Sequence, residues 1–216
     1  MDLLGRHEKF EIEILYRLNS GRILEKLVFG GGTMLRLCHE LNRYSADLDF
    51  WLTKTVDFEE FLKRICSQLE VEYEITDRQN KHFSLLVEVR SSDHPKRLKL
   101  EIRKEIRNWD MEKSIAFSKF SNRQVLLNSH TLIQTMINKI EALINRGEIR
   151  DAFDIEFLLR KGIALPKITE KNRNLLKEKI NSFGMSDFKV KLGSLLAEDM
   201  RKYYIENRFR YLMDKI

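Results

Sequence analysis

Three of the nine glycines in this 216-residue chain stand together, at Gly30, Gly31 and Gly32. Leu27–Phe29 before them is apolar, and Met34–Leu41 after them has apolar residues at helical spacing. This order predicts a short strand, a glycine turn and a helix. Such a turn lets backbone N–H groups approach an anion at the positive end of the helix dipole, so it suits a phosphate. Neither the P-loop nor the Rossmann glycine spacing is present, and the turn alone is a weak sign of function.

Two prolines and nine glycines argue against an all-β sandwich and favour long helices. The composition, 43% hydrophobic and 33% charged, is that of a globular protein. No apolar run approaches a bilayer span, and the N-terminus lacks the apolar core of a signal peptide. We therefore expect a cytoplasmic protein with no membrane partner. Cys38 and Cys66 have no CxxC or Cys/His spacing, which excludes a zinc site and a disulfide framework.

The formal net charge is +6, and the segment 167–216 alone holds twelve basic and seven acidic residues. This asymmetry suggests a polyanionic partner such as nucleic acid, although a solvated helical face gives a weaker form of the same pattern.

Hydrophobic periodicity predicts an α+β fold. The N-terminal part should hold a mixed or antiparallel sheet flanked by helices, and the C-terminal part a helical bundle, with domains over residues 1–120 and 121–216. The expected helices are 4–18, 58–69 capped by Asp57, 131–145, 148–160, 170–181 and 187–214. The expected strands are 27–29, 46–52, 71–76, 82–90 and 97–106, the last three forming an antiparallel meander.

Asp47 and Asp49 stand two residues apart on the predicted strand 46–52, so their carboxylates share one face with Trp51. Two adjacent carboxylates can share divalent cations. A lone Asp-x-Asp pair is more often an acidic, solvent-facing edge. Here it follows the glycine turn with one helix between, so that both can face the same crevice.

Two-metal phosphoryl or nucleotidyl transfer also uses a third carboxylate. Glu101 is the candidate, because it projects from the polar face of a later strand. Glu88 competes for this role, and an ion pair of Glu101 with Lys99 or Arg103 is an equally supported alternative.

The runs Phe29–Arg36 and Arg43–Phe50 resemble the AbiEii/AbiGii toxin-type nucleotidyltransferases of the polymerase-β superfamily. Lys139–Arg146 and Arg150–Ile155 resemble a later motif of that family, which has a lysine, an arginine and a basic-Asp pair on consecutive helices. The resemblance spans about residues 20 to 160. The glycine before Gly31 and the arginine at position 150 are minor departures from the family pattern.

The resemblance implies an NTP substrate and Mg²⁺ bound by Asp47 and Asp49. With Glu101 as the candidate third carboxylate, we expect a two-metal site. The resemblance also implies that Gly31, Gly32, Thr33 and Ser45 bind the nucleotide, and that Lys139 reaches its phosphates. Further nucleotide contacts are implied for Arg146, Arg150, Asp151 and Asp154. Offsets of seven and four also allow Lys139, Arg146 and Arg150 to line one edge. A salt-bridged bundle surface is the alternative for these helices.

These features favour a magnesium-dependent nucleotidyltransferase that moves NMP from an NTP to an acceptor hydroxyl. RNA, such as a tRNA end, is the expected acceptor. A toxin role with a cognate antitoxin is implied by the resemblance alone. The alternatives are transfer to a protein or a small molecule, or a catalytically idle module that binds nucleotide or nucleic acid.

Overall fold

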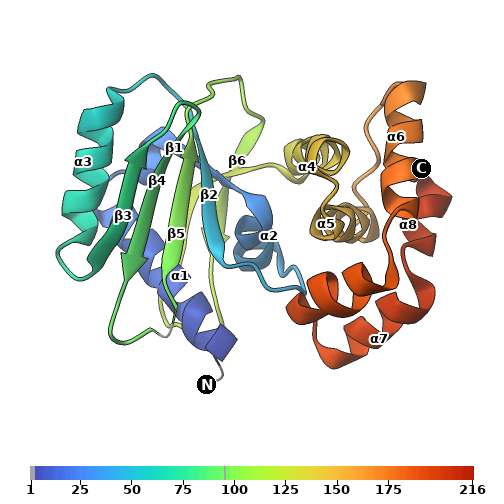
Figure 1. The fold of residues 1–216 in the computed structure, drawn as a ribbon. Coiled ribbons are helices and arrows are strands. Elements are labelled where there is room, and N and C mark those ends of the chain that lie inside the picture. Colours follow the sequence, from blue (N-terminus) through green and yellow to red (C-terminus); the bar gives the residue numbers. More distant parts are fainter. Residues whose placement is uncertain (1–2, 95) are drawn as a thin grey trace. The chain divides into compact units, whose positions relative to one another are not determined.

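The computed structural model describes residues 3–94 and 96–216, and the chain divides into two compact units (Figure 1). Unit 1 comprises Met1–Glu40 and Ser45–His130, and unit 2 comprises Leu41–Tyr44 and Thr131–Ile216. The domain division expected after residue 120 differs from this one, because a last strand extends unit 1 to His130. The short segment Leu41–Tyr44 also belongs to unit 2, although it lies in the sequence between two elements of unit 1.

Unit 1 contains a seven-stranded mixed sheet with the order β3-β4-β5-β2-β1-β7-β6. The parallel pairs are β2 with β5 and β1 with β7, and the other neighbours are antiparallel. The mixed sheet and the antiparallel β3-β4-β5 meander confirm the predicted fold class. The strands are β1 (Leu27–Gly30), β2 (Asp47–Leu52), β3 (Glu74–Asn80), β4 (Ser84–Arg90), β5 (Leu98–Arg103), β6 (Met111–Ala116) and β7 (Val125–His130). The helices are α1 (Leu3–Ser20), η1 (Leu24–Lys26), α2 (Gly31–His39) and α3 (Phe58–Leu69).

One face of the sheet forms the core of unit 1. Leu48, Phe50 and Leu52 alternate along β2 with less buried residues, as predicted, and they are fully buried. Helices α1 and α3 pack against each other and against strands of the sheet. The N-terminus of α3 is confirmed, since the Asp57 carboxylate accepts a hydrogen bond of 2.8 Å from the Glu60 N–H. The opposite face of β2 consequently carries the polar residues.

The hairpin of β6 and β7 was not predicted. Strand β6 lies at the sheet edge, and most of its residues are exposed, so its sequence lacks apolar alternation. The first strand of the meander also begins at Glu74 rather than Val71.

Unit 2 is helical, as predicted. The expected helices 131–145, 148–160 and 170–181 correspond to α4 (Leu132–Arg146), α5 (Ile149–Arg160) and α6 (Glu170–Asn181). The single helix expected over 187–214 is instead four shorter elements: η2 (Asp187–Leu192, a π-helix), η3 (Gly193–Leu195), α7 (Glu198–Asn207) and α8 (Arg210–Lys215). Extended backbone at Leu196, which forms an isolated antiparallel bridge with Arg43, and a positive φ of 51° at Arg208 cause the interruptions.

Within the described ranges, every helix is too short or too polar to cross a lipid bilayer. Cys38 and Cys66 are free thiols, and burial raises the pKa of both.

Candidate active site

The two carboxylates of β2 lie on its polar face, in unit 1. Asp47 and Asp49 are half-buried and alternate with the buried Leu48 and Phe50. The β-strand period of two therefore places both carboxylates on the same side, as the sequence predicted.

The glycine turn directly contacts this strand. Gly30 caps α2 with extended backbone, and Gly31 has a φ of +75°, which side-chain-bearing residues rarely adopt. A Cβ atom at Gly31 would collide with Asp49 Oδ2. The Asp49 carboxylate consequently lies against the first residue of α2, where backbone N–H groups have no acceptor within the helix. The glycine turn at the start of α2 and the Asp49 carboxylate are thus neighbours in one unit.

Thr33 and Ser45 were predicted to bind the nucleotide. The Thr33 side chain is fully buried, and its hydroxyl donates a 2.6 Å hydrogen bond to the backbone carbonyl of Asp47. This hydroxyl thus holds the start of β2 against α2. Ser45 is half-buried in the loop that precedes β2.

The third predicted carboxylate, Glu101, lies on the neighbouring strand. In the register of β2 with β5, Asp49 is opposite Glu101 and Asp47 is opposite Lys99. Lys99 Nζ lies 3.1 Å from Glu101 Oε2. Burial raises the pKa of Glu101, but Lys99 and Arg103 outweigh it and bring the pKa below its ordinary value. Glu101 therefore forms the ion pair that the sequence offered as the alternative role.

Glu88, the competing candidate, lies on β4, which is separated from β2 by β5. Its Oε1 accepts a 2.6 Å hydrogen bond from Thr76 and lies 2.9 Å from Arg97 Nη1. Because Glu101 is directly beside Asp49 and Glu88 is two strands away, Glu101 is the better placed of the two.

The predicted ligands Asp47, Asp49 and Glu101 do not form a single metal cluster. Across residues 3–94 and 96–216, no group of three His, Cys, Asp or Glu side chains is arranged to hold a metal ion. The Asp47 and Asp49 pair nevertheless fits Mg²⁺, which prefers oxygen ligands and is commonly bound through one or two carboxylates together with substrate phosphates and water.

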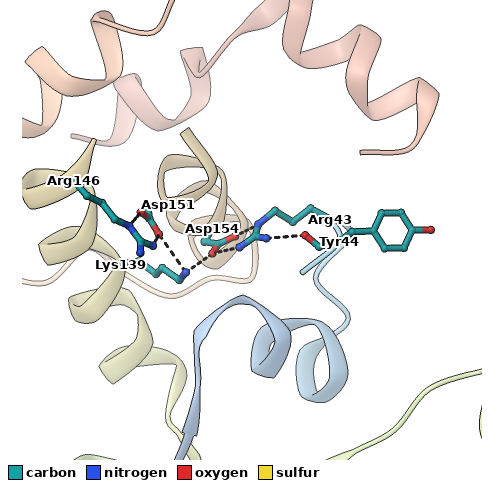
Figure 2. A network of polar contacts seen from close by, with 6 residues as sticks. All are labelled: Arg43, Tyr44, Lys139, Arg146, Asp151 and Asp154. Atoms are coloured by element: carbon teal, nitrogen blue, oxygen red, sulfur yellow. Dashed lines mark hydrogen bonds and ion pairs between the residues drawn. The ribbon is translucent and has the colours of Figure 1, made fainter. Parts of the chain in front are cut away.

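Four of the predicted residues of α4 and α5, namely Lys139, Arg146, Asp151 and Asp154, form a charge network in unit 2 (Figure 2). Lys139 Nζ lies 2.6 Å from Asp154 Oδ2 and 3.3 Å from Asp151 Oδ1. Both aspartates are fully buried, and Lys139 is 7% exposed. Arg146 closes one end of the network with two hydrogen bonds of 2.7 Å to Asp151.

Arg43 closes the other end and was missed as a site residue, although it lies within the motif that precedes Asp47. Its guanidinium binds both oxygens of Asp154, at 2.6 and 2.7 Å. Burial raises the pKa of Asp154, but Arg43 and Lys139 outweigh this effect and lower it below its ordinary value. The network thus contains two carboxylates and three cations.

Arg150 is not part of this network. Helix α4 ends at Gly147, whose φ is +66°, so Arg150 lies in the first turn of a different helix. Its side chain is exposed and makes no ion pair with any described residue. Arg150 therefore does not share the ion pairs of Lys139 and Arg146, and the single edge expected from these three residues stays a prediction.

The sequence also matches a family of known proteins. A family model described as "Nucleotidyl transferase AbiEii toxin, Type IV TA system" matches residues 13–208. No curated protein matches the sequence.

Solved structures share the fold at low identity. A putative nucleotidyltransferase from Helicobacter pylori is 20% identical, with 96% of this chain and 95% of that chain covered and a TM-score of 0.61. JHP933 from the same organism is also 20% identical, with coverages of 96% and 92% and a TM-score of 0.59. MenT4, a nucleotidyltransferase toxin from Mycobacterium tuberculosis H37Rv, is 17% identical, with coverages of 98% and 87% and a TM-score of 0.53.

Proposed function

Because the chain belongs to the AbiEii family of nucleotidyltransferase toxins, we propose that it transfers NMP from an NTP to a hydroxyl group of RNA, such as a tRNA end, with release of pyrophosphate. The observation that carries this proposal is the Asp49 carboxylate lying against Gly31 at the start of α2. It brings a metal ligand and a phosphate-binding helix terminus together.

In this proposal, Asp47 and Asp49 hold Mg²⁺, which supplies charge neutralisation at the reacting phosphate. The N–H groups of Gly31, Gly32 and Thr33 bind the triphosphate oxygens. Glu101, beside Asp49, orients the acceptor hydroxyl once the Lys99 ammonium group releases the Glu101 carboxylate or shares it with that hydroxyl.

The roles proposed for unit 2 are more limited. Lys139 was predicted to reach the phosphates, and this stays a prediction, since its ammonium group is held by Asp151 and Asp154. Arg146 and the exposed Arg150 remain proposed nucleotide contacts. The family is that of type IV toxin–antitoxin systems, so we also propose that a cognate antitoxin counteracts this chain.

The test is incubation of the purified protein with each α-labelled NTP, Mg²⁺ and total RNA. We expect label on RNA, and we expect Asp49→Ala to abolish it. Asp77→Asn is the matched control, because Asp77 lies on the edge strand β3, away from β2, and should leave labelling unchanged. Label on the protein itself or on a small molecule would overturn the RNA acceptor. Binding of Mg²⁺ and NTP without any transfer would indicate an idle binding module.

Two further variants separate the candidates for the third carboxylate. Glu101→Gln should reduce transfer strongly with little change in NTP affinity, since its proposed role concerns the acceptor. Glu88→Gln should have little effect on transfer. The reverse order would assign the role to Glu88.

A further inference from the structure

The polar face of β2 continues beyond the carboxylates to an aromatic side chain. Trp51 is two residues after Asp49 on the same face, about 6.6 Å further along the strand. It is half-buried, and the register places it opposite the exposed Arg103, whose guanidinium carbon lies 5.4 Å from the Trp51 ring centroid. A partly exposed indole and a guanidinium therefore lie next to the carboxylate pair.

Contacts with the glycine turn and with two further rings fix the position of the Trp51 ring. A Cβ atom at Gly30 would lie 2.5 Å from the Trp51 ring, so the indole packs directly on the glycine turn. The Trp109 ring packs edge-on against the Trp51 ring at a centroid distance of 6.1 Å. The His130 ring is tilted against the Trp51 ring at a centroid distance of 4.7 Å. Trp109 is buried and donates its indole N–H to the Leu52 carbonyl at 3.3 Å. Trp109 and His130 are thus buried, and Trp51 is the partly exposed member of this aromatic cluster.

We propose that Trp51 and Arg103 form a stacking subsite for a nucleobase. Bases stack on aromatic rings and on guanidinium planes without strong sequence preference. In the proposed function, phosphates bind at the glycine turn and, through Mg²⁺, at Asp49. Trp51 lies about 6.6 Å further along the same strand face, on the side where a base of the same nucleotide can reach it. The subsite rests on the proposed function, and it takes either the base of the NTP or the terminal base of the RNA acceptor.

The chain has two tryptophans, so intrinsic fluorescence can follow each one alone. Trp109→Phe retains Trp51 as the fluorophore, and Trp51→Phe retains the buried Trp109 as the matched control. Each variant is titrated, with Mg²⁺ present, with an NTP, with a short single-stranded RNA and with inorganic triphosphate. We expect saturable quenching of Trp51 by NTP or RNA, no quenching by triphosphate, and little response of Trp109. Quenching by NTP assigns the subsite to the donor base, and quenching by RNA alone assigns it to the acceptor.

Affinity provides a second readout. Trp51→Ala should weaken binding of the quenching ligand by about 5- to 100-fold, while Trp51→Phe, which keeps an aromatic face, should lose much less. Circular dichroism verifies that both variants are folded. The proposal is overturned if NTP and triphosphate bind equally well and Trp51 is not quenched by NTP or RNA, a result that leaves the phosphate site intact. If neither NTP nor triphosphate binds, the proposed function fails as well.

Discussion

Glu11, in the middle of α1, is a buried carboxyl group with unusual surroundings. It is 1% exposed, and neither of its oxygens has a hydrogen-bond partner among the described residues. His7 Nε2 lies 3.7 Å from Glu11 Oε1, and burial lowers the pKa of that histidine. Burial and then the charge of Glu8 raise the pKa of Glu11 well above its ordinary value. Glu11 therefore keeps its proton to a higher pH than an exposed glutamate does.

The raised pKa of Glu11 makes the stability of the folded chain depend on pH. The folded chain binds the Glu11 proton more tightly than the unfolded chain does, so the free energy of unfolding falls as pH rises from about 4.5 through the raised pKa. We expect Glu11→Gln to remove this decline and to be more stable than the parent at neutral pH. Urea unfolding at a series of pH values measures it. Glu141→Gln, an exposed acid on α4, is the control and should leave the profile unchanged. Parallel profiles for Glu11→Gln and the parent would refute the prediction.

Gly31 allows a second prediction at the same scale. Gly31→Ala places a methyl group against Asp49 Oδ2 in a backbone conformation that alanine rarely adopts. We expect loss of binding of Mg²⁺ and NTP, together with destabilisation of about 2–4 kcal/mol from strain and collision.

Gly162→Ala is the matched control, because Gly162 has a similar φ of +86° and nothing within 4 Å of the added Cβ. It should cost only the backbone strain, about 1–2 kcal/mol, and leave ligand binding intact. Calorimetric titration and thermal unfolding distinguish the two effects. Normal ligand binding by Gly31→Ala would contradict the proposed site.

At the scale of elements, the charge network between α4 and α5 should stabilise unit 2. Asp154→Ala leaves Arg43 and Lys139 buried without their shared carboxylate, and we expect it to lose about 3–5 kcal/mol. Arg150→Ala, on the same helix but exposed, should change stability by no more than about 0.5 kcal/mol. Urea unfolding measures both. A loss below about 1 kcal/mol for Asp154→Ala would mean that the network contributes little net stability.

Elements with a clear period were predictable from the sequence. Strand β2 alternates between buried and half-buried residues, and α4 has a regular apolar face, so local pattern alone identified both. Strand β6 was missed because its pairing with β7, rather than an apolar face, makes it a strand. The breaks near Leu196 and Arg208 were missed because no proline marks them.

In the candidate site, too, residues that lie close together in the sequence were predictable, and pairings between distant residues were not. Asp47, Asp49 and the glycine turn lie close together in the sequence, within one strand-turn-helix-strand unit. The bond between Arg43 and Asp154 joins residues 111 positions apart, which no local period reveals. The engagement of Glu101 by Lys99 depends on rotamers, so the sequence left it open.

At the scale of the whole molecule, the charge of +6 bears on the proposed RNA acceptor. Binding that neutralises phosphates releases counterions, so affinity should fall steeply with salt, with a log–log slope of about −0.7 for each phosphate contacted on single-stranded RNA. Filter binding of labelled RNA across a salt series measures the slope. An affinity independent of salt would exclude an electrostatic RNA interface.

The segment Leu41–Tyr44 limits how this protein can be divided. Arg43 belongs to unit 2, but it precedes the rest of that unit by almost ninety residues, since the rest begins at Thr131. A cut at the later boundary would remove Arg43, which is one of the two cations that bind Asp154 and is also the bridge partner of Leu196. The helical half is therefore not a transferable module. Recombination between relatives would preserve it only if the residue at position 43 and the aspartate at position 154 were inherited together.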